Sequence, residues 1–158
     1  MLAFWTINLI NFSLYSTGLK KIFISSDHAG YKLKNYLFLK LSKKNHINDL
    51  GPFSDESVDY PDYAKKLSRK VQSYKGSFGV LICGSGMGMA MSANKTKKVR
   101  AALCYSVKNT KLSRLHNNAN IITLGERLIS KNKALNLVKI FLKTKFEGGR
   151  HLRRIKKI

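Results

Sequence analysis

Cysteine and acidic side chains are both scarce in this sequence. Cys83 and Cys104 are its two cysteines among 158 residues, and they show neither a CxxC motif nor another metal-ligand spacing. A disulfide-rich scaffold is therefore excluded, and unpaired thiols suit a reducing compartment. We expect a cytoplasmic protein with an ordinary apolar core, for which 44% hydrophobic residues suffice.

The shortage of acidic residues leaves 8 of them against 30 lysines and arginines, a formal net charge of +22. A charge of this size first suggests a nucleic-acid partner. However, most of the excess is lysine, it is spread along the chain, and no RNA- or DNA-binding motif accompanies it. We therefore expect no nucleic-acid partner, and a positive field that attracts a small anionic substrate.

A long, clean apolar run is also missing, so we expect no membrane association. Residues 1–19 are apolar and aromatic, but they lack the basic start of a secretory signal and the arginines of a transit peptide. We interpret them as a poorly ordered extension. A single domain over residues 20–158 is expected to carry the function.

The most informative stretch that is present covers residues 79–95. A β-rich apolar run ends in Cys83, three glycines follow at alternate positions, and a segment compatible with a helix comes next. The glycines allow a sharp turn and close approach of a ligand, and the helix directs its positive end at the turn. A thiolate at this corner is a competent base or nucleophile. A phosphate-binding turn with an incidental cysteine explains the stretch about equally well, whereas Walker and dinucleotide-binding motifs do not match.

Strand-like apolar runs alternate with helical periodicities along the rest of the chain. The expected strands are 20–26, 47–50, 79–83, 99–104 and 120–124. The expected helices are 31–44, 61–71, 89–95, 106–116 and 134–141, followed by a basic helical segment from 148. Five such alternations predict a parallel sheet covered by helices on both faces.

Polar motifs follow three of these strands at their carboxyl ends, where ligands bind in parallel sheets. Asp27 and His28 follow the first strand, the Cys83 turn follows the third, and Arg127 follows the fifth. The His116-Asn117 pair instead follows a helix, at the other end of a simple βα unit. That pair would have to serve a neighbouring subunit's site or lie on a bent loop.

Several motifs together match one enzyme family in order and spacing. They are Ser26-Asp27-His28-Ala29-Gly30, Asp59-Tyr60-Pro61-Asp62-Tyr63-Ala64, Ile82-Cys83-Gly84-Ser85-Gly86-Met87-Gly88, Ala93-Asn94-Lys95, Arg100-Ala101-Ala102, Ser113-Arg114-Leu115-His116-Asn117-Asn118-Ala119-Asn120, Gly125-Glu126-Arg127 and Gly148-Gly149-Arg150-His151. On these motifs the sequence resembles the type B ribose-5-phosphate isomerases, whose family also contains galactose-6-phosphate isomerase subunits. The resemblance covers residues 20–155 and leaves residues 1–19 outside.

The resemblance implies an α/β fold: a Rossmann-like three-layer αβα sandwich with a five-stranded parallel sheet and a C-terminal helix. It implies a homodimer or a dimer of dimers whose active sites are shared between two subunits. The implied activity is the interconversion of D-ribose 5-phosphate and D-ribulose 5-phosphate, with no cofactor and no metal. A hexose-6-phosphate isomerase of the same family, acting on allose or galactose 6-phosphate, and a non-catalytic phosphate-binding module are the alternatives.

Catalytic roles also follow from the resemblance. Cys83 corresponds to the base that abstracts the proton, and Met89 occupies the position where another branch of the family has a glutamate base. Ser85 would pass a proton between O1 and O2 of the sugar. His116, with Asp27 nearby, would open the furanose ring by moving a proton at the ring oxygen.

The implied substrate contacts are more numerous. Backbone N–H groups of the turn would hold the enediolate, positively charged side chains would grip the phosphate, and Asn117 would bind sugar hydroxyls. The substrate-binding residues are Asp27, His28, Gly84, Ser85, Gly86, Met87, Gly88, Asn117, Arg127, Arg150 and Arg154. We expect Cys83 and Arg150 to come from one subunit. The partner would supply His116, Asn117 and Arg127.

Five other polar residues receive a structural interpretation. Cys104 is expected in the core, within its strand, and His46 on the surface. Arg153 is expected to be solvated beside Arg154. His151 would line or cap the site. Tyr60 fits pocket closure and loop structure equally well.

Overall fold

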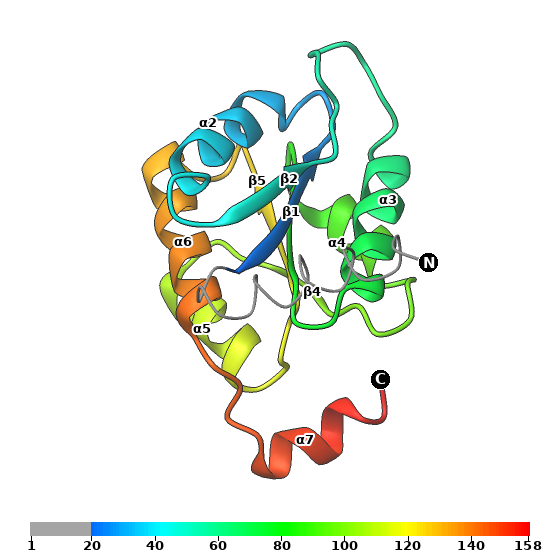
Figure 1. Cartoon of the computed structure of the whole chain (residues 1–158), viewed down its shortest axis with the longest axis vertical. Helices are drawn as coiled ribbons and strands as arrows, with labels where there is room; N and C mark the ends of the chain where they lie inside the picture. The colour runs from blue at the N-terminus through cyan, green and yellow to red at the C-terminus, as the bar shows by residue number, and fades with distance from the viewer. Residues whose placement is uncertain (1–19) are drawn as a thin grey trace, which may run out of the picture.

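The computed structural model describes residues 20–158, so the expectation for residues 1–19 lies outside the described part of the chain. Five parallel strands form one sheet in the order β2-β1-β3-β5-β4 (Figure 1). The strands are β1 (Lys21–Ser26), β2 (His46–Asp49), β3 (Phe78–Cys83), β4 (Ala101–Leu103) and β5 (Ile121–Gly125). The helices are α2 (Tyr31–Leu41), α3 (Tyr60–Ser73), α4 (Met87–Ala93), α5 (Val107–Leu115), α6 (Lys131–Lys143) and α7 (Gly149–Ile155).

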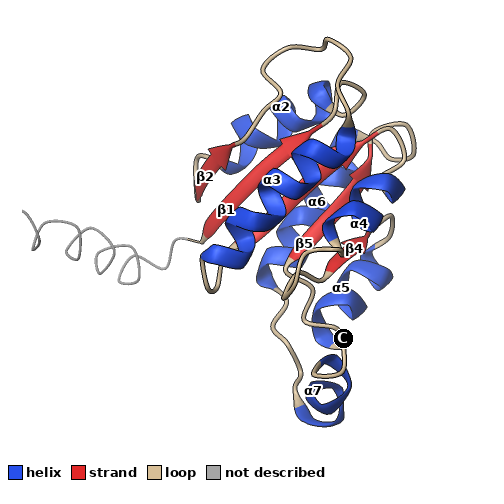
Figure 2. Ribbon diagram, turned by 90° about the vertical axis from the view of Figure 1, so that its right-hand side faces the viewer, coloured by secondary structure: helices blue, strands red, loops and turns tan. Residues whose placement is uncertain are grey.

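Helices cover both faces of this sheet, as Figure 2 shows. On one face, side chains such as Ile22 and Ile82 pack with apolar residues of α2 and α6, and α5 lies beside α6. On the other face, side chains such as Phe23 and Leu81 pack against α3 and α4. This alternation is what a strand buried on both faces requires. The predicted three-layer αβα sandwich with a five-stranded parallel sheet is therefore confirmed.

Strand β4 is shorter than the predicted range 99–104, and Cys104 lies just beyond it. The side chain of Asn120 accepts the backbone N–H of Arg100 at 2.8 Å and donates to the carbonyl of Lys98 at 2.9 Å. The Asn120 side chain thus takes up the N–H of Arg100, while the Arg100 carbonyl still accepts from the backbone N–H groups of Asn120 and Ile121. Cys104 is buried in the core, as expected.

Helix α4 begins at Met87, two residues earlier than predicted. The preceding residue, Gly86, has a φ of 78°, which glycine adopts without strain and other residues rarely do. Helix α6 also begins early, because the Ser130 hydroxyl accepts the backbone N–H of Lys133 and caps its first turn.

The C-terminal helix α7 lies apart from the sheet, beyond the end opposite the carboxyl ends of the strands (Figure 1). The extended segment 144–148 carries it there, and Arg114 anchors that segment by donating to the Thr144 carbonyl at 3.2 Å. Arg114 also donates to Asn118 and Ala119 and lies over the rings of Phe78 and Phe141. Burial, followed by repulsion from Arg100, lowers the pKa of the Arg114 guanidinium.

Among residues 20–158, none of the helices combines the length and the apolar character needed to cross a bilayer.

Candidate active site

The carboxyl ends of β1, β3 and β5 converge on one group of backbone hydrogen bonds. The N–H of Asp27 donates to the carbonyl of Ile82 at 3.1 Å. From the other side, the N–H groups of Glu126 and Arg127 donate to the carbonyls of Cys83 and Gly84 at 2.9 and 3.1 Å. The three polar motifs predicted for the strand ends are thus brought together.

The Cys83 turn is built around its glycines. A Cβ on Gly86 would lie 2.7 Å from Leu103 and 2.8 Å from the backbone of Leu124, and a Cβ on Gly125 would lie 2.7 Å from the backbone of Ser85. All three distances are shorter than real side chains tolerate, so glycine at these two positions allows the two loops to touch through their backbones.

The thiol of Cys83 lies at the base of this turn with 5% of the residue exposed. The backbone N–H of Gly86 donates to its Sγ at 3.0 Å, and the N–H of Met87 donates to the Ser85 hydroxyl at 3.3 Å. The sulfur therefore accepts the N–H of Gly86, the residue directly before α4, and this contact favours negative charge on it. Met89 is fully buried and carries no group that could accept a proton.

Asp27 and His28 flank the turn from β1. The Asp27 carboxylate is buried and accepts the N–H of Gly30 at 2.9 Å, just before α2 begins. His28 is exposed, and its Nδ1 lies 3.2 Å from the backbone N–H of Val58, which can donate to it. The same Nδ1 lies 3.3 Å from the Val58 carbonyl oxygen, so the ring tautomer decides whether Nδ1 accepts or donates here.

Arg127 lies against the Cys83 turn of its own chain. Its guanidinium atoms are 3.1–3.2 Å from where a Cβ on Gly84 would be. The expectation that Arg127 would reach the site from a partner subunit is therefore wrong. The reason is strand polarity: Arg127 follows β5, which is parallel to β3 and ends beside it.

Tyr60 closes another side of the same turn. The residue opens α3, and its ring atoms would lie 2.7 Å from a Cβ on Gly88. Of the two interpretations left open for Tyr60, this packing favours a place at the wall of the site.

A second group of predicted residues lies at the opposite end of the sheet. His116 ends α5, and its ring stacks on His151 of α7 with centroids 4.2 Å apart and planes 6° from parallel. Arg150, Arg154 and the exposed Asn117 lie on the same two chain segments. The expected pairing of Arg150 with Cys83 is therefore wrong, because α7 packs beside the end of α5.

Glu147 belongs to this second group, and the sequence interpretation missed it. Its carboxylate lies 3.7 Å from Nε2 of His116, and its backbone N–H donates to the carbonyl of Leu115 at 3.1 Å. Burial, and next the proximity of His116, lower the pKa of His151. The signal that was available is its position directly before the Gly-Gly-Arg-His motif.

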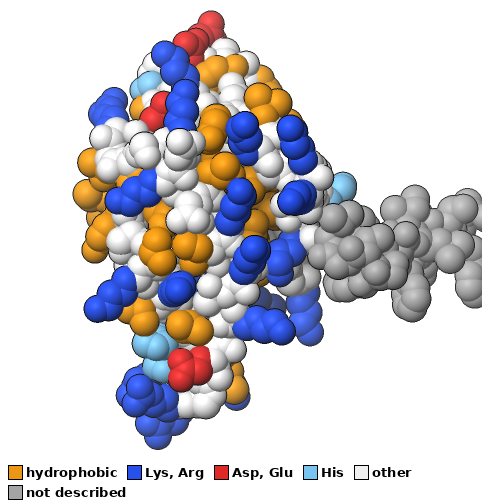
Figure 3. Space-filling model, turned by 90° about the vertical axis from the view of Figure 1, so that its left-hand side faces the viewer, with side chains coloured by type: hydrophobic (Ala, Val, Ile, Leu, Met, Phe, Trp, Pro, Cys, Tyr) orange, Lys and Arg blue, Asp and Glu red, His pale blue; other side chains and the backbone are white. Residues whose placement is uncertain are grey.

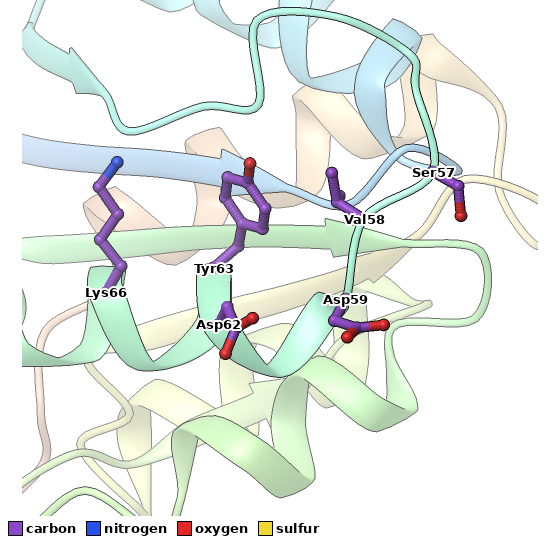
Figure 4. Close-up of a pocket in the computed structure, with 6 residues that line it drawn as sticks. All are labelled: Ser57, Val58, Asp59, Asp62, Tyr63 and Lys66. Carbon is purple, nitrogen blue, oxygen red and sulfur yellow. The ribbon is translucent and has the colours of Figure 1, made fainter.

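A shallow pocket of about 500 Å³ lies between the loop before α3 and the helix itself (Figure 4). Its lining residues are Ser57, Val58, Asp59, Asp62, Tyr63 and Lys66. None of the predicted catalytic or substrate-binding residues lines it. Within one chain, the predicted site is instead divided between the Cys83 turn at one end and the His116 group at the other.

Known proteins resemble this chain in both sequence and structure. Residues 22–158 match the family model described as Ribose/Galactose Isomerase. Ribose-5-phosphate isomerase B of Escherichia coli is 36% identical over 141 residues, which cover 89% of this chain and 95% of that protein. The crystal structure of a ribose 5-phosphate isomerase from Thermotoga maritima is 48% identical with a TM-score of 0.85, covering 87% of this chain and 96% of its own. The crystal structure of Ribose-5-phosphate Isomerase B from Mycoplasma genitalium with bound ribulose-5-phosphate is 45% identical, with a TM-score of 0.83. The match covers 87% of this chain and 92% of the Mycoplasma chain. The chain therefore belongs to the ribose/galactose isomerase family.

Proposed function

We propose that this protein interconverts D-ribose 5-phosphate and D-ribulose 5-phosphate, an aldose–ketose isomerisation of the non-oxidative pentose phosphate pathway. The observation that carries the proposal is the Cys83 turn, where a buried thiol faces the N–H of Gly86 at 3.0 Å. The Mycoplasma genitalium relative with bound ribulose-5-phosphate supports the choice of substrate. The reaction would take place in the cytoplasm, where free thiols stay reduced.

The proposed proton transfer is carried out by Cys83. Its thiolate removes the proton from C2 of the open-chain aldose and returns it to C1, and Ser85 moves the second proton between O2 and O1. The intermediate is an enediolate, whose negative charge the backbone N–H groups of residues 84–88 would stabilise. No metal or cofactor takes part in this scheme.

Ring opening and substrate binding require the second group of residues. His116, with Asp27 nearby, would move the proton at the ring oxygen, and Asn117 would bind sugar hydroxyls. The phosphate would be held by His28 and Arg127 from one side and by Arg150 and Arg154 from the other, since guanidinium groups match phosphate oxygens in pairs.

We further propose a homodimer, or a dimer of such dimers, in which each site combines the Cys83 turn of one copy with the His116 group of the other. The distance between the two groups within one chain supports this arrangement (Figure 1). Large apolar side chains are also exposed on and beside α4 and α5, near the edge strand β4: Met87, Met91, Tyr105, Val107 and Leu112. A second copy on this edge would bury them, as a symmetric interface requires.

A hexose-6-phosphate isomerase is the second candidate, because the family description itself names galactose as well as ribose. The test is turnover by the purified protein of ribose 5-phosphate against allose and galactose 6-phosphates, with and without EDTA. We expect ribose 5-phosphate to be preferred and EDTA not to abolish activity. Binding of sugar phosphate without exchange of the C2 proton into solvent would instead indicate a non-catalytic binding module.

A further inference from the structure

Three side chains with metal-binding atoms meet at the α7 end of the molecule. His116 ends α5, Glu147 lies in the extended segment 144–148, and His151 lies in α7. One ligand atom from each lies within 4.8 Å of the other two. Figure 3 shows histidine and acidic side chains in contact at this end, next to a group of lysines and arginines.

His151 has a buried nitrogen atom with no hydrogen-bond partner among the described residues. The residue is 6% exposed, and among the described residues its Nε2 has no hydrogen-bond partner. A buried nitrogen without a partner is costly, so a missing ligand is a natural explanation.

We propose that His116, Glu147 and His151 bind a zinc ion, and that the bound ion inhibits the isomerase by occupying His116. Two imidazoles and one carboxylate are an established ligand set for zinc, with a fourth position left for water. Binding stands without the proposed function, whereas the inhibition rests on it, because His116 is needed there to open the sugar ring.

Binding requires the His116 ring to turn out of its stack on His151, because zinc bonds in the plane of an imidazole and cannot lie in the planes of two parallel rings at once. Zinc–ligand bonds of about 2.1 Å place tetrahedral ligands about 3.4 Å apart, against separations of up to 4.8 Å here. His151 is fixed by burial, while the side chains of His116 and Glu147 are 37% and 56% exposed and free to adjust. Arg150 and Arg154 oppose a divalent cation, so we expect reversible binding weaker than that of a structural zinc site.

Binding is tested by titrating zinc into the metal-free full chain and following heat, with cobalt absorption as a second probe. We expect one ion per chain, and at least a roughly tenfold weaker affinity in both His116→Gln and Glu147→Gln. Two control variants change residues outside the group: His46→Gln removes a surface histidine, and Cys83→Ser removes a thiol that is not one of the three ligands. Both variants should bind zinc as the wild type does.

The site is overturned if zinc binds His116→Gln as tightly as wild type, or if Cys83→Ser is the variant that loses binding. Glu147→Gln is the variant least expected to disturb folding, because the Glu147 side chain is exposed and lies outside the helices. Thermal unfolding of each variant confirms that a weaker affinity does not arise from an unfolded chain.

Inhibition is tested on the same proteins with ribose 5-phosphate. We expect zinc to inhibit the wild type, EDTA to reverse the effect, and Glu147→Gln to need at least about tenfold more zinc. An active wild type that binds zinc through these residues and stays uninhibited overturns the inhibition. A chain that binds zinc here but isomerises no sugar phosphate supports the site and overturns the proposed function.

Discussion

The backbone N–H of Gly86 donates to Sγ of Cys83 at 3.0 Å, so the first peptide group ahead of α4 is directed at the sulfur. This contact places a stabilising dipole beside the atom that would carry negative charge during proton abstraction. The proposed mechanism leaves no other base at the turn, because Met89 cannot accept a proton.

Cys83→Ser is therefore expected to lower kcat by about 10²–10⁴-fold, since a hydroxyl is a far weaker acid than a thiol and loss of a general base has effects of this size. Substrate binding, measured by calorimetry, should remain close to wild type. Cys104→Ala is the matched control, because this second cysteine is buried in the core away from the turn. A Cys83→Ser enzyme with a tenth of the wild-type rate would show that another group is the base.

The proposed sharing of sites is tested by mixing inactive homodimers. Cys83→Ala mixed with His116→Ala, and separately with Arg150→Ala, should regain about a quarter of wild-type activity. Random exchange makes about half of the dimers mixed, and each mixed dimer has one intact site of two. Cys83→Ala mixed with Arg127→Ala should stay inactive, because both residues lie at the same turn and neither mixed site is intact.

Mass spectrometry of differently tagged chains must show that subunits exchange in each mixture. Recovery in the Cys83 and Arg127 mixture, or exchange without recovery in the Cys83 and His116 mixture, would contradict the assignment of the two groups.

Gly86→Ala should destabilise the turn more than Gly76→Ala does. Both glycines have a φ near 80°, so both variants carry backbone strain of about 1–2 kcal/mol. At Gly86 the new Cβ would also clash with Leu103 and Leu124. At Gly76 no atom lies within 4 Å of the new Cβ. Urea unfolding of the two variants measures the difference, and equal losses would show that the turn absorbs the methyl group.

Arg114→Met should loosen the attachment of α7. It removes three guanidinium hydrogen bonds, to the carbonyls of Thr144 and Ala119 and to the side-chain oxygen of Asn118, each worth about 1.5–3 kcal/mol. We expect a lower free energy of unfolding and faster proteolysis in segment 144–148. Arg153→Met, at an exposed position of α7, is the control and should change neither.

The stability of the protein should fall on mild acidification because of His151. Burial lowers its pKa in the folded state below the ordinary value of 6.5, so the unfolded chain binds the proton more tightly. The contribution of His151 to stability is complete above about pH 6.5 and declines as the pH drops from there towards its folded pKa. Urea midpoints between pH 8 and pH 5 measure this, and His151→Gln should show a shallower decline than wild type.

The fold was largely predictable because its signals are local. The apolar run ending in Cys83, with glycines at alternate positions, predicts a strand, a turn and a helix without reference to the rest of the chain. The start of β4 was predicted too early because a side chain distant in the sequence, Asn120, binds the N–H of Arg100 and the carbonyl of Lys98.

Which site residues lie together depends instead on strand polarity and on contacts between segments that are distant in the sequence. Strand polarity correctly separated His116 from Cys83, and the same rule, applied to β5, gives the observed place of Arg127. The place of Arg150 did not follow from polarity, because it depends on where Arg114 fixes the segment leading to α7. Glu147 lies in that segment, which has no regular secondary structure to predict.

The extended segment that carries α7 has a consequence for how such a protein can diversify. Segment 144–148 connects α7 to the rest of the molecule, and its hydrogen bonds to α5 are made outside the Cys83 turn: Arg114 donates to the Thr144 carbonyl, and the N–H of Glu147 donates to the Leu115 carbonyl. Changes in the length or direction of this segment would therefore move Arg150 and Arg154 while the Cys83 turn keeps its packing. If these arginines hold the phosphate as proposed, such changes alone would adapt the site to sugars of different length.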